Sequence, residues 1–289
     1  MQDKISLERK IKCTVLNILM YLSAGIICLI LLGLIGYILY RGLPHISLEF
    51  LTEKPSLLRE TVGILPNILN TVYIILITLV IVLPIGVGAA IYLNEYAKNK
   101  KVVKIIELAT ETLSGIPSII YGLVGMLIFV QFFSLGTSLL AGSLTLVIMT
   151  LPTVIRTTQE SLKTVPNGYR EGSLALGAGK WYMIRTILIP SALPGVITGV
   201  ILAIGRIVGE SAALLYTAGS GALLPANVQG YLDKIFQSGG TLTIQLYLSM
   251  SKGEYDVAYG IALVLLIIVL VINLATKFMA KKFDVNRLK

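Results

Sequence analysis

The sequence predicts an all-α integral membrane protein with six transmembrane helices. Of its 289 residues, 55% are hydrophobic and only 13% are charged, whereas soluble domains have about 25% charged residues. The mean hydropathy is +0.85. A helix needs about 20 apolar residues to cross a membrane, and six stretches reach or approach that length: residues 15–40, 68–93, 113–133, 138–155, 192–215 and 257–279.

The distribution of positive charge orients these spans. With the N-terminus inside, 18 of the 24 lysines and arginines fall in inner segments, at residues 1–12, 95–106, 156–190 and 275–289. Cytoplasmic loops of membrane proteins carry such an excess, which predicts that both termini are cytoplasmic. The net charge of +9 therefore reflects membrane topology, and we expect a multi-pass protein of the cell membrane, in the lipid bilayer, with no nucleic-acid partner.

The first span begins after a short basic segment. Its apolar run, residues 15–40, is longer than the roughly 7 to 15 apolar residues of a cleavable signal. We therefore expect an uncleaved helix that, with the following outer loop, forms an N-terminal addition at residues 1–62. Residues 63–289 then form a five-helix core.

Prolines and amphipathic patterns mark the middle spans. Pro84 and Pro117 lie inside the second and third spans, where neighbouring helices can satisfy the freed carbonyl groups. An amphipathic stretch at 102–112 is expected to continue directly into the third span. Pro152 interrupts the fourth span, which is expected to be short. The outer loop 216–256 is long enough to fold locally or bind a partner.

Two charges, Arg206 and Glu210, lie inside the fifth span. A charge at the bilayer centre costs about 2.5 to 3.5 kcal/mol, so such residues usually serve a transport pathway. Small residues that share their helix face would let another helix approach closely: Gly195, Gly199, Ala203 and Ala213. Two interpretations remain open. The charges either form a buried pair that stabilises the bundle, or Glu210 restrains Arg206 until an anionic substrate competes for it.

Arg156, at the inner end of the fourth span, is a second candidate for a substrate pathway. Arginines at inner helix ends also serve simply as topology anchors, so its position alone leaves both roles open.

The inner loop between the fourth and fifth spans predicts a short helix at 169–178, which ends near Gly177. A short helix tied to two spans can dock in a groove of a peripheral protein. The sequence contains no phosphate-binding signature of the type G-x-x-x-x-G-K-[ST]. We therefore expect no ATPase site, no catalytic residues and no metal ligands in this chain.

The inner loop also carries a family resemblance. Glu171-Gly172-Ser173, then Gly177, then Ile187-Leu188-Ile189-Pro190 resembles the cytoplasmic coupling motif of binding-protein-dependent ABC permeases. That motif is written EAA, three residues, G, nine residues, I-x-LP. Here Gly172 and Ser173 replace the two alanines, and Ile189 replaces leucine. The segments 113–123, 151–166, 175–181 and 205–215 are further similar to the PstA family of phosphate permease subunits.

The resemblance implies a type I (MetI-like) importer fold and an ATP-driven import of inorganic phosphate. The family's substrate-pathway residues correspond to Arg206, Arg156 and Glu210, and its contacts with the ATPase to Glu171, Gly172, Ser173, Gly177 and Pro190. Implied partners are a PstC-like second permease, two PstB-like ATPase subunits that hold ATP and Mg, and an extracytoplasmic PstS-like phosphate-binding protein. The alternatives are a permease for sulfate or molybdate, or a secondary transporter driven by an ion gradient.

Overall fold

The protein is described by a computed structural model that covers residues 2–55, 63–224 and 228–282. Every regular element in these ranges is a helix, which confirms the predicted all-α class. The predicted boundary at residue 62 lies outside the described residues. In chain order the helices are α1 (Gln2–Gly42), η1 (Leu43–His45), α2 (Leu48–Thr52), α3 (Leu65–Ile91), η2 (Tyr92–Tyr96), α4 (Lys100–Ser114), α5 (Ser118–Gly125), η3 (Met126–Phe132), α6 (Leu139–Thr164), α7 (Asn167–Ala175), α8 (Lys180–Met183), η4 (Ile184–Leu188), α9 (Ile189–Gly209), α10 (Ala212–Thr217), α11 (Val228–Asp233), η5 (Lys234–Phe236), α12 (Leu242–Ser251) and α13 (Tyr255–Lys282).

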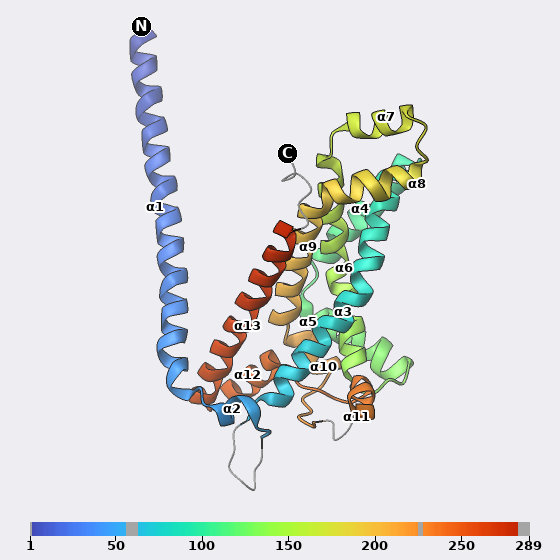
Figure 1. Ribbon diagram of the computed structural model, residues 1–289. Coiled ribbons are helices and arrows are strands. Elements are labelled where there is room, and N and C mark those ends of the chain that lie inside the picture. Colours follow the sequence, from blue (N-terminus) through green and yellow to red (C-terminus); the bar gives the residue numbers. More distant parts are fainter. Residues whose placement is uncertain (1, 56–62, 225–227, 283–289) are drawn as a thin grey trace.

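Five stretches of helix in the described chain are long and apolar enough to cross a membrane: Lys12–His45, Leu65–Tyr96, Leu139–Thr164, Lys180–Gly209 and Tyr255–Phe278. A sixth crossing results if α4 and the α5–η3 segment count as one bent span. Figure 1 shows the N-terminal end of α1, the C-terminal end of α13 and the short helix α7 at the same end of the molecule. This arrangement agrees with an even number of crossings.

The third span differs from its prediction. We expected the amphipathic stretch 102–112 to continue into it through residues 114–117, but α4 and the α5–η3 segment meet at an angle of 99°. The helix α4 ends at Ser114 with Gly115 as its C-cap. Pro117 then precedes α5 in an extended conformation, with ψ at 138°. A proline disfavours helical geometry in the residue before it, so Ile116 cannot continue the helix.

Two other spans also have different ends from those predicted. The helix α6 spans 26 residues and contains Pro152 in its interior, so the proline does not shorten the span. The fifth span begins at Lys180, before the predicted start at residue 192. It ends at Gly209, because Glu210 leaves the helical conformation with ψ at 124°.

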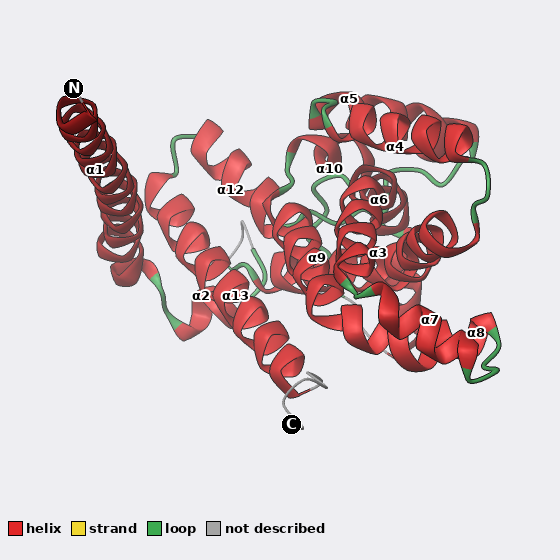
Figure 2. Ribbon diagram, turned by 90° about the horizontal axis from the view of Figure 1, so that it is seen from above, coloured by secondary structure: helices red, strands yellow, loops and turns green. Residues whose placement is uncertain are grey.

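The helix α6 lies at the centre of the bundle and packs against both α3 and α9 (Figures 1 and 2). In contrast, α1 stands apart from the bundle and approaches it only near its C-terminal end, through α13 and η1. The side chains described along α1 are almost all exposed, as expected for a helix surrounded by lipid or by another subunit.

Close contacts through glycine fix how α9 and α6 align. A side chain at Gly195 would collide with Ser161, and one at Gly199 would collide with Thr157. Each step of four residues toward the C-terminus of α9 thus matches four residues toward the N-terminus of α6, which defines an antiparallel register. The predicted stripe of small residues is therefore confirmed on α9 for Gly195, Gly199 and the buried Ala203, whereas Ala213 lies on the next helix, α10.

The long outer loop folds locally into α11, η5 and α12 and is fastened to the outer end of α3. The Asn67 and Asn70 amides donate hydrogen bonds to the Gly240 carbonyl, at 2.9 and 3.0 Å. Asn70 also donates to the Gly221 carbonyl at 3.3 Å. Both asparagines are buried, so α3 and the outer loop form one packed unit.

We predict that Gly86→Leu destabilises the protein by about 1 to 3 kcal/mol, the usual cost of overpacking a core. A Cβ atom at Gly86 would lie 2.7 Å from Cγ1 of Val154 and would push α3 away from α6. The measurement is the thermal denaturation midpoint of the purified protein in detergent. Gly88→Leu is the matched control, because a Cβ atom at Gly88 meets nothing within 4 Å. Equal midpoints for the two variants would contradict the α3–α6 contact.

Candidate functional site

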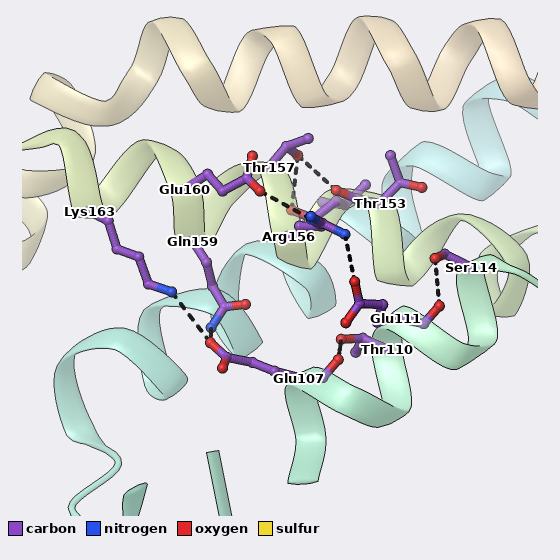
Figure 3. A network of polar contacts seen from close by, with 11 residues as sticks. Glu107, Thr110, Glu111, Ser114, Thr153, Arg156, Thr157, Gln159, Glu160 and Lys163 are labelled. Atoms are coloured by element: carbon purple, nitrogen blue, oxygen red, sulfur yellow. Dashed lines mark hydrogen bonds and ion pairs between the residues drawn. The ribbon is translucent and has the colours of Figure 1, made fainter. Parts of the chain in front are cut away.

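A polar pocket of about 440 Å³ lies between α4 and α6. Both helices present charged and hydroxyl side chains to it at i, i+3 and i, i+4 spacing (Figure 3). The lining residues are Glu107, Thr110, Glu111, Ser114, Pro152, Thr153, Arg156, Thr157, Gln159, Glu160 and Lys163. The pocket exists because the chain bends after Ser114, so that α4, the helix before the bend, lies against the inner half of α6.

Arg156 projects from α6 into this pocket, where two carboxylates hold its guanidinium. Its Nε donates to Glu160 Oε1 at 3.0 Å, and its Nη1 lies 3.6 Å from Glu111 Oε1 on α4 (Figure 3). The Arg156 side chain is 61% exposed. Exposed ion pairs are weak, because water screens them and two long side chains lose entropy. A competing anion can therefore displace these carboxylates while the pocket is hydrated.

The other half of the pocket is centred on Glu107 of α4. Its Oε1 accepts from Gln159 Nε2 and lies near Lys163 Nζ, at 3.4 Å in each case. Glu107 and Glu111 of α4 thus face Arg156 and Lys163 of α6 across the pocket, and Glu160 lies beside Arg156 on α6. In the part of the chain that the structure describes, no group of three or more acidic, histidine or cysteine side chains is placed to hold a metal ion.

Arg206 lies outside this pocket, in the last turn of α9. The register between α9 and α6 places it level with Thr150, about 9 Å along the helix axis from Arg156. Its side chain is partly buried. Among the described residues, no hydrogen bond or ion pair engages the Arg206 guanidinium.

The prediction that Arg206 and Glu210 pair is wrong. Glu210 follows the end of α9, so the i, i+4 geometry of a continuous helix does not apply to it. Its carboxylate is buried and accepts the Ala213 backbone N–H at 2.9 Å. Glu210 therefore caps the start of α10, and the interpretation in which it restrains Arg206 is not supported.

The predicted inner helix is present as α7 and begins two residues earlier than expected. It ends in a left-handed residue, Gly177, at φ +81°. The Ala178 N–H bonds to the Ser173 carbonyl and the Gly177 N–H to the Leu174 carbonyl, which is the Schellman pattern. Glu171 and Gly172 are exposed on this helix, whereas Ser173 is buried. Leu174 and Leu176 are 50% and 90% exposed, so α7 presents an apolar surface to the cytoplasm.

Pro190 is the second residue of α9, which continues η4 without a break, so its missing backbone N–H falls inside the helical stretch. It does not mark the start of the fifth span, because α8 and η4 run into α9 as one helical stretch. The short helix and Pro190 are thus separated by more than two further helical turns.

The structure brings together Arg156, Glu111 and Glu160, of which only Arg156 was predicted as a site residue. Glu107 and Glu111 lie at i, i+4 spacing, as do Arg156 and Glu160. This spacing predicts two charged helix faces but gives no indication that they face one another. The 99° bend after α4 produces that contact.

Comparisons with known proteins place the chain in a family. Residues 82–287 match the model of the binding-protein-dependent transport system inner membrane component. The chain is 38% identical to the probable ABC transporter permease protein YqgI of Bacillus subtilis, over 97% of this chain and 100% of that protein. It is 33% identical to the phosphate transport system permease protein PstA of Xylella fastidiosa, over 82% and 81% of the two chains.

The fold matches that of a solved bacterial alginate ABC transporter, crystallised with an alginate-bound periplasmic protein. The TM-score is 0.68, with 16% identity over 96% of this chain and 98% of that chain. The chain belongs to the family of binding-protein-dependent inner membrane permeases and is an integral membrane subunit of an ABC importer.

Proposed function

We propose that this chain is the PstA-type permease subunit of an ATP-driven importer of inorganic phosphate. The observation that carries the proposal is the spacing of two arginines along one pair of helices. Arg156 lies in the polar pocket, and Arg206 lies about 9 Å further along the α6–α9 pair. A guanidinium donates two parallel hydrogen bonds to a tetrahedral oxyanion. The similarity to a phosphate permease of Xylella fastidiosa supports phosphate as the anion.

The two arginines hold phosphate in succession and release it easily. Conduction requires binding that is strong enough for entry and weak enough for exit. Arg206 has no carboxylate partner in the described chain, so it is available to an anion that arrives from outside. At Arg156 the Glu111 and Glu160 carboxylates compete with phosphate and limit how long it stays.

The helix α7 couples transport to ATP hydrolysis on a partner chain. Glu171 and Gly172 are exposed on this helix, Ser173 is buried beneath them, Gly177 ends the helix, and Pro190 lies near the start of α9. The exposed Leu174 and Leu176 suit a groove on a peripheral ATPase subunit. ATP and Mg are held by two such PstB-like subunits.

The remaining partners follow from the same proposal. A PstC-like permease completes the pathway, since a single chain of this kind supplies only half of it. A PstS-like phosphate-binding protein delivers phosphate to the outer loop, which the Asn67 and Asn70 hydrogen bonds hold against the outer end of α3.

The experiment that tests this proposal is uptake of radiolabelled phosphate by proteoliposomes that contain all four kinds of subunit. We expect uptake to require ATP and the binding protein, and to persist in an excess of sulfate or molybdate. Uptake of sulfate or molybdate in place of phosphate would show that the transported anion is not phosphate. Uptake that continues without ATP but stops with an ionophore would reject the ATP-driven mechanism.

Arg206→Gln should lower phosphate uptake about 10- to 100-fold, because it removes a charge-assisted contact that glutamine cannot replace. Assembly of the complex should be unchanged, since no described ion pair or hydrogen bond of Arg206 stabilises the fold. Arg206→Lys keeps the positive charge but loses the planar guanidinium that donates two parallel hydrogen bonds, and it should retain intermediate uptake. Normal uptake by the glutamine variant would remove Arg206 from the pathway.

Glu111→Gln combined with Glu160→Gln should lower the KM for phosphate about 2- to 5-fold, because Arg156 loses two weak competitors. Arg156→Gln should raise KM instead. Both effects are read from initial uptake rates across phosphate concentrations. A KM that responds to neither change would place Arg156 outside the substrate pathway and leave it as a topology anchor.

Gly177→Val should release the ATPase or uncouple it from uptake. A β-branched residue at φ +81° carries a strain of about 1 to 2 kcal/mol and would change how α7 ends. Gly179→Val is the matched control, because Gly179 has φ −68° and ψ 150°, which any residue adopts. Co-purification and substrate-stimulated ATP hydrolysis measure the effect, and identical behaviour of the two variants would argue against a coupling role for Gly177.

A further inference from the structure

A second cluster of charges lies at the inner end of the bundle, away from the polar pocket. Arg170 of α7 donates through Nε and Nη2 to Oε1 of Glu95, at 3.2 and 3.1 Å. The two side chains are only 17% and 6% exposed. This is the most buried ion pair in the described chain, and its partners lie 75 residues apart in the sequence.

Arg170 also bonds to the end of α6. Its Nη1 donates to the Val165 carbonyl at 2.8 Å, and its Nη2 donates to the Leu162 carbonyl at 2.9 Å. Carbonyl groups at a helix end lack the usual i+4 partner; the Leu162 carbonyl accepts the Val165 N–H at 3.4 Å, and Arg170 adds a bond to it and to the Val165 carbonyl from α7. One guanidinium thus bonds to the end of α6 and to η2, the helical extension of α3.

The other side of the α7 loop reaches the same point. Lys180, at the start of α8, donates a hydrogen bond to the Glu95 backbone carbonyl, and its ammonium lies 4.8 Å from the centre of the Tyr96 ring. Asn94 Nδ2 donates to Glu95 Oε1 at 2.7 Å. The loop that contains α7 is therefore attached to η2 on both of its flanks.

These contacts matter because the chain itself does not connect α7 to α3. A displacement of α7 would pull α6 through the short link at Val165 and Pro166, and α9 through α8 and η4. Only side-chain contacts can transmit it to α3. The helix α3 in turn packs along α6 and holds the outer loop through Asn67 and Asn70.

We propose that Glu95 and Arg170 form a joint that makes α3 move together with α7, so that force from the cytoplasmic face reaches the outer end of the bundle. Both are positioning residues, since neither contacts substrate. The inference rests on the proposed coupling role of α7. Without the pair, α7 still docks on its partner, but it reaches α3 only through Lys180 and through the packing of α3 on α6, so the movement of α3 is reduced.

The first test compares Glu95→Gln, Arg170→Gln and the double variant in reconstituted complexes, with phosphate imported per ATP hydrolysed as the readout. Each single variant should lower this ratio about 5-fold or more, the size of typical coupling between sites. Because the two groups act as one unit, the double variant should be no worse than the poorer single variant. Lys98→Gln removes a nearby exposed charge and is the control, which should keep the normal ratio.

An unchanged ratio in the single variants, or effects that multiply in the double variant, would overturn the proposed joint.

A second measurement does not depend on the substrate or on the yield of the variants. Spin labels on cysteines at Gly168 of α7 and Val80 of α3, with Cys13 and Cys28 replaced by serine, report the distance between the two helices. On nucleotide trapping this distance should stay constant in the parent protein and change in Glu95→Gln.

An identical response of the distance in both proteins would reject the joint whatever the substrate is. If the parent complex hydrolyses ATP without importing phosphate, the proposal that phosphate is the substrate is rejected. The label distance then still decides whether α3 and α7 move together.

Discussion

The close packing of α6 between α3 and α9 is the constraint on which the other features depend. Gly86 of α3 admits Val154, while Gly195 and Gly199 of α9 admit Ser161 and Thr157. Without side chains at these positions the helix backbones come close enough for van der Waals contact to hold them, which is how helices associate in lipid. The same contacts fix the rotation of α6 about its axis, which directs Arg156 away from α3 and α9 and toward α4.

Much of this architecture follows from the sequence, because hydropathy and charge distribution act over whole segments. The apolar spans and the inner helix depend on such averages: five of the six predicted spans are long helices, the sixth is present as a pair of helices bent by 99°, and the inner helix is present as α7. The ends of the spans depend on single residues. Pro152 was expected to interrupt its helix but is accommodated within it, whereas Pro117 contributes to a 99° bend. The difference lies in the neighbours, since Gly115 already ends α4 two residues before Pro117.

The Arg206–Glu210 pair shows why a helical pattern can mislead at its last turn. A separation of four residues predicts a pair only while the helix continues. Glu210 departs from helical geometry and caps the next helix, because the Ala213 N–H at the start of α10 needs an acceptor that α9 cannot supply. Arg206 is left at the end of α9, where the helix dipole favours a positive charge. This placement stabilises a cation without fixing it to a carboxylate.

The helix α6 connects the joint to the polar pocket. Arg170 holds the Leu162 carbonyl, and Arg156 lies six residues earlier, about 9 Å along the same helix. Pro152, one turn before Arg156, lines the pocket and removes one backbone hydrogen bond from the helix. Helices bend most readily at such positions. Val154, Thr157 and Ser161 pack the part of α6 beyond Pro152 against α3 and α9, so a force that arrives through Arg170 acts on that part of α6 together with its two neighbours. The point where α6 bends most easily therefore coincides with the pocket that contains Arg156.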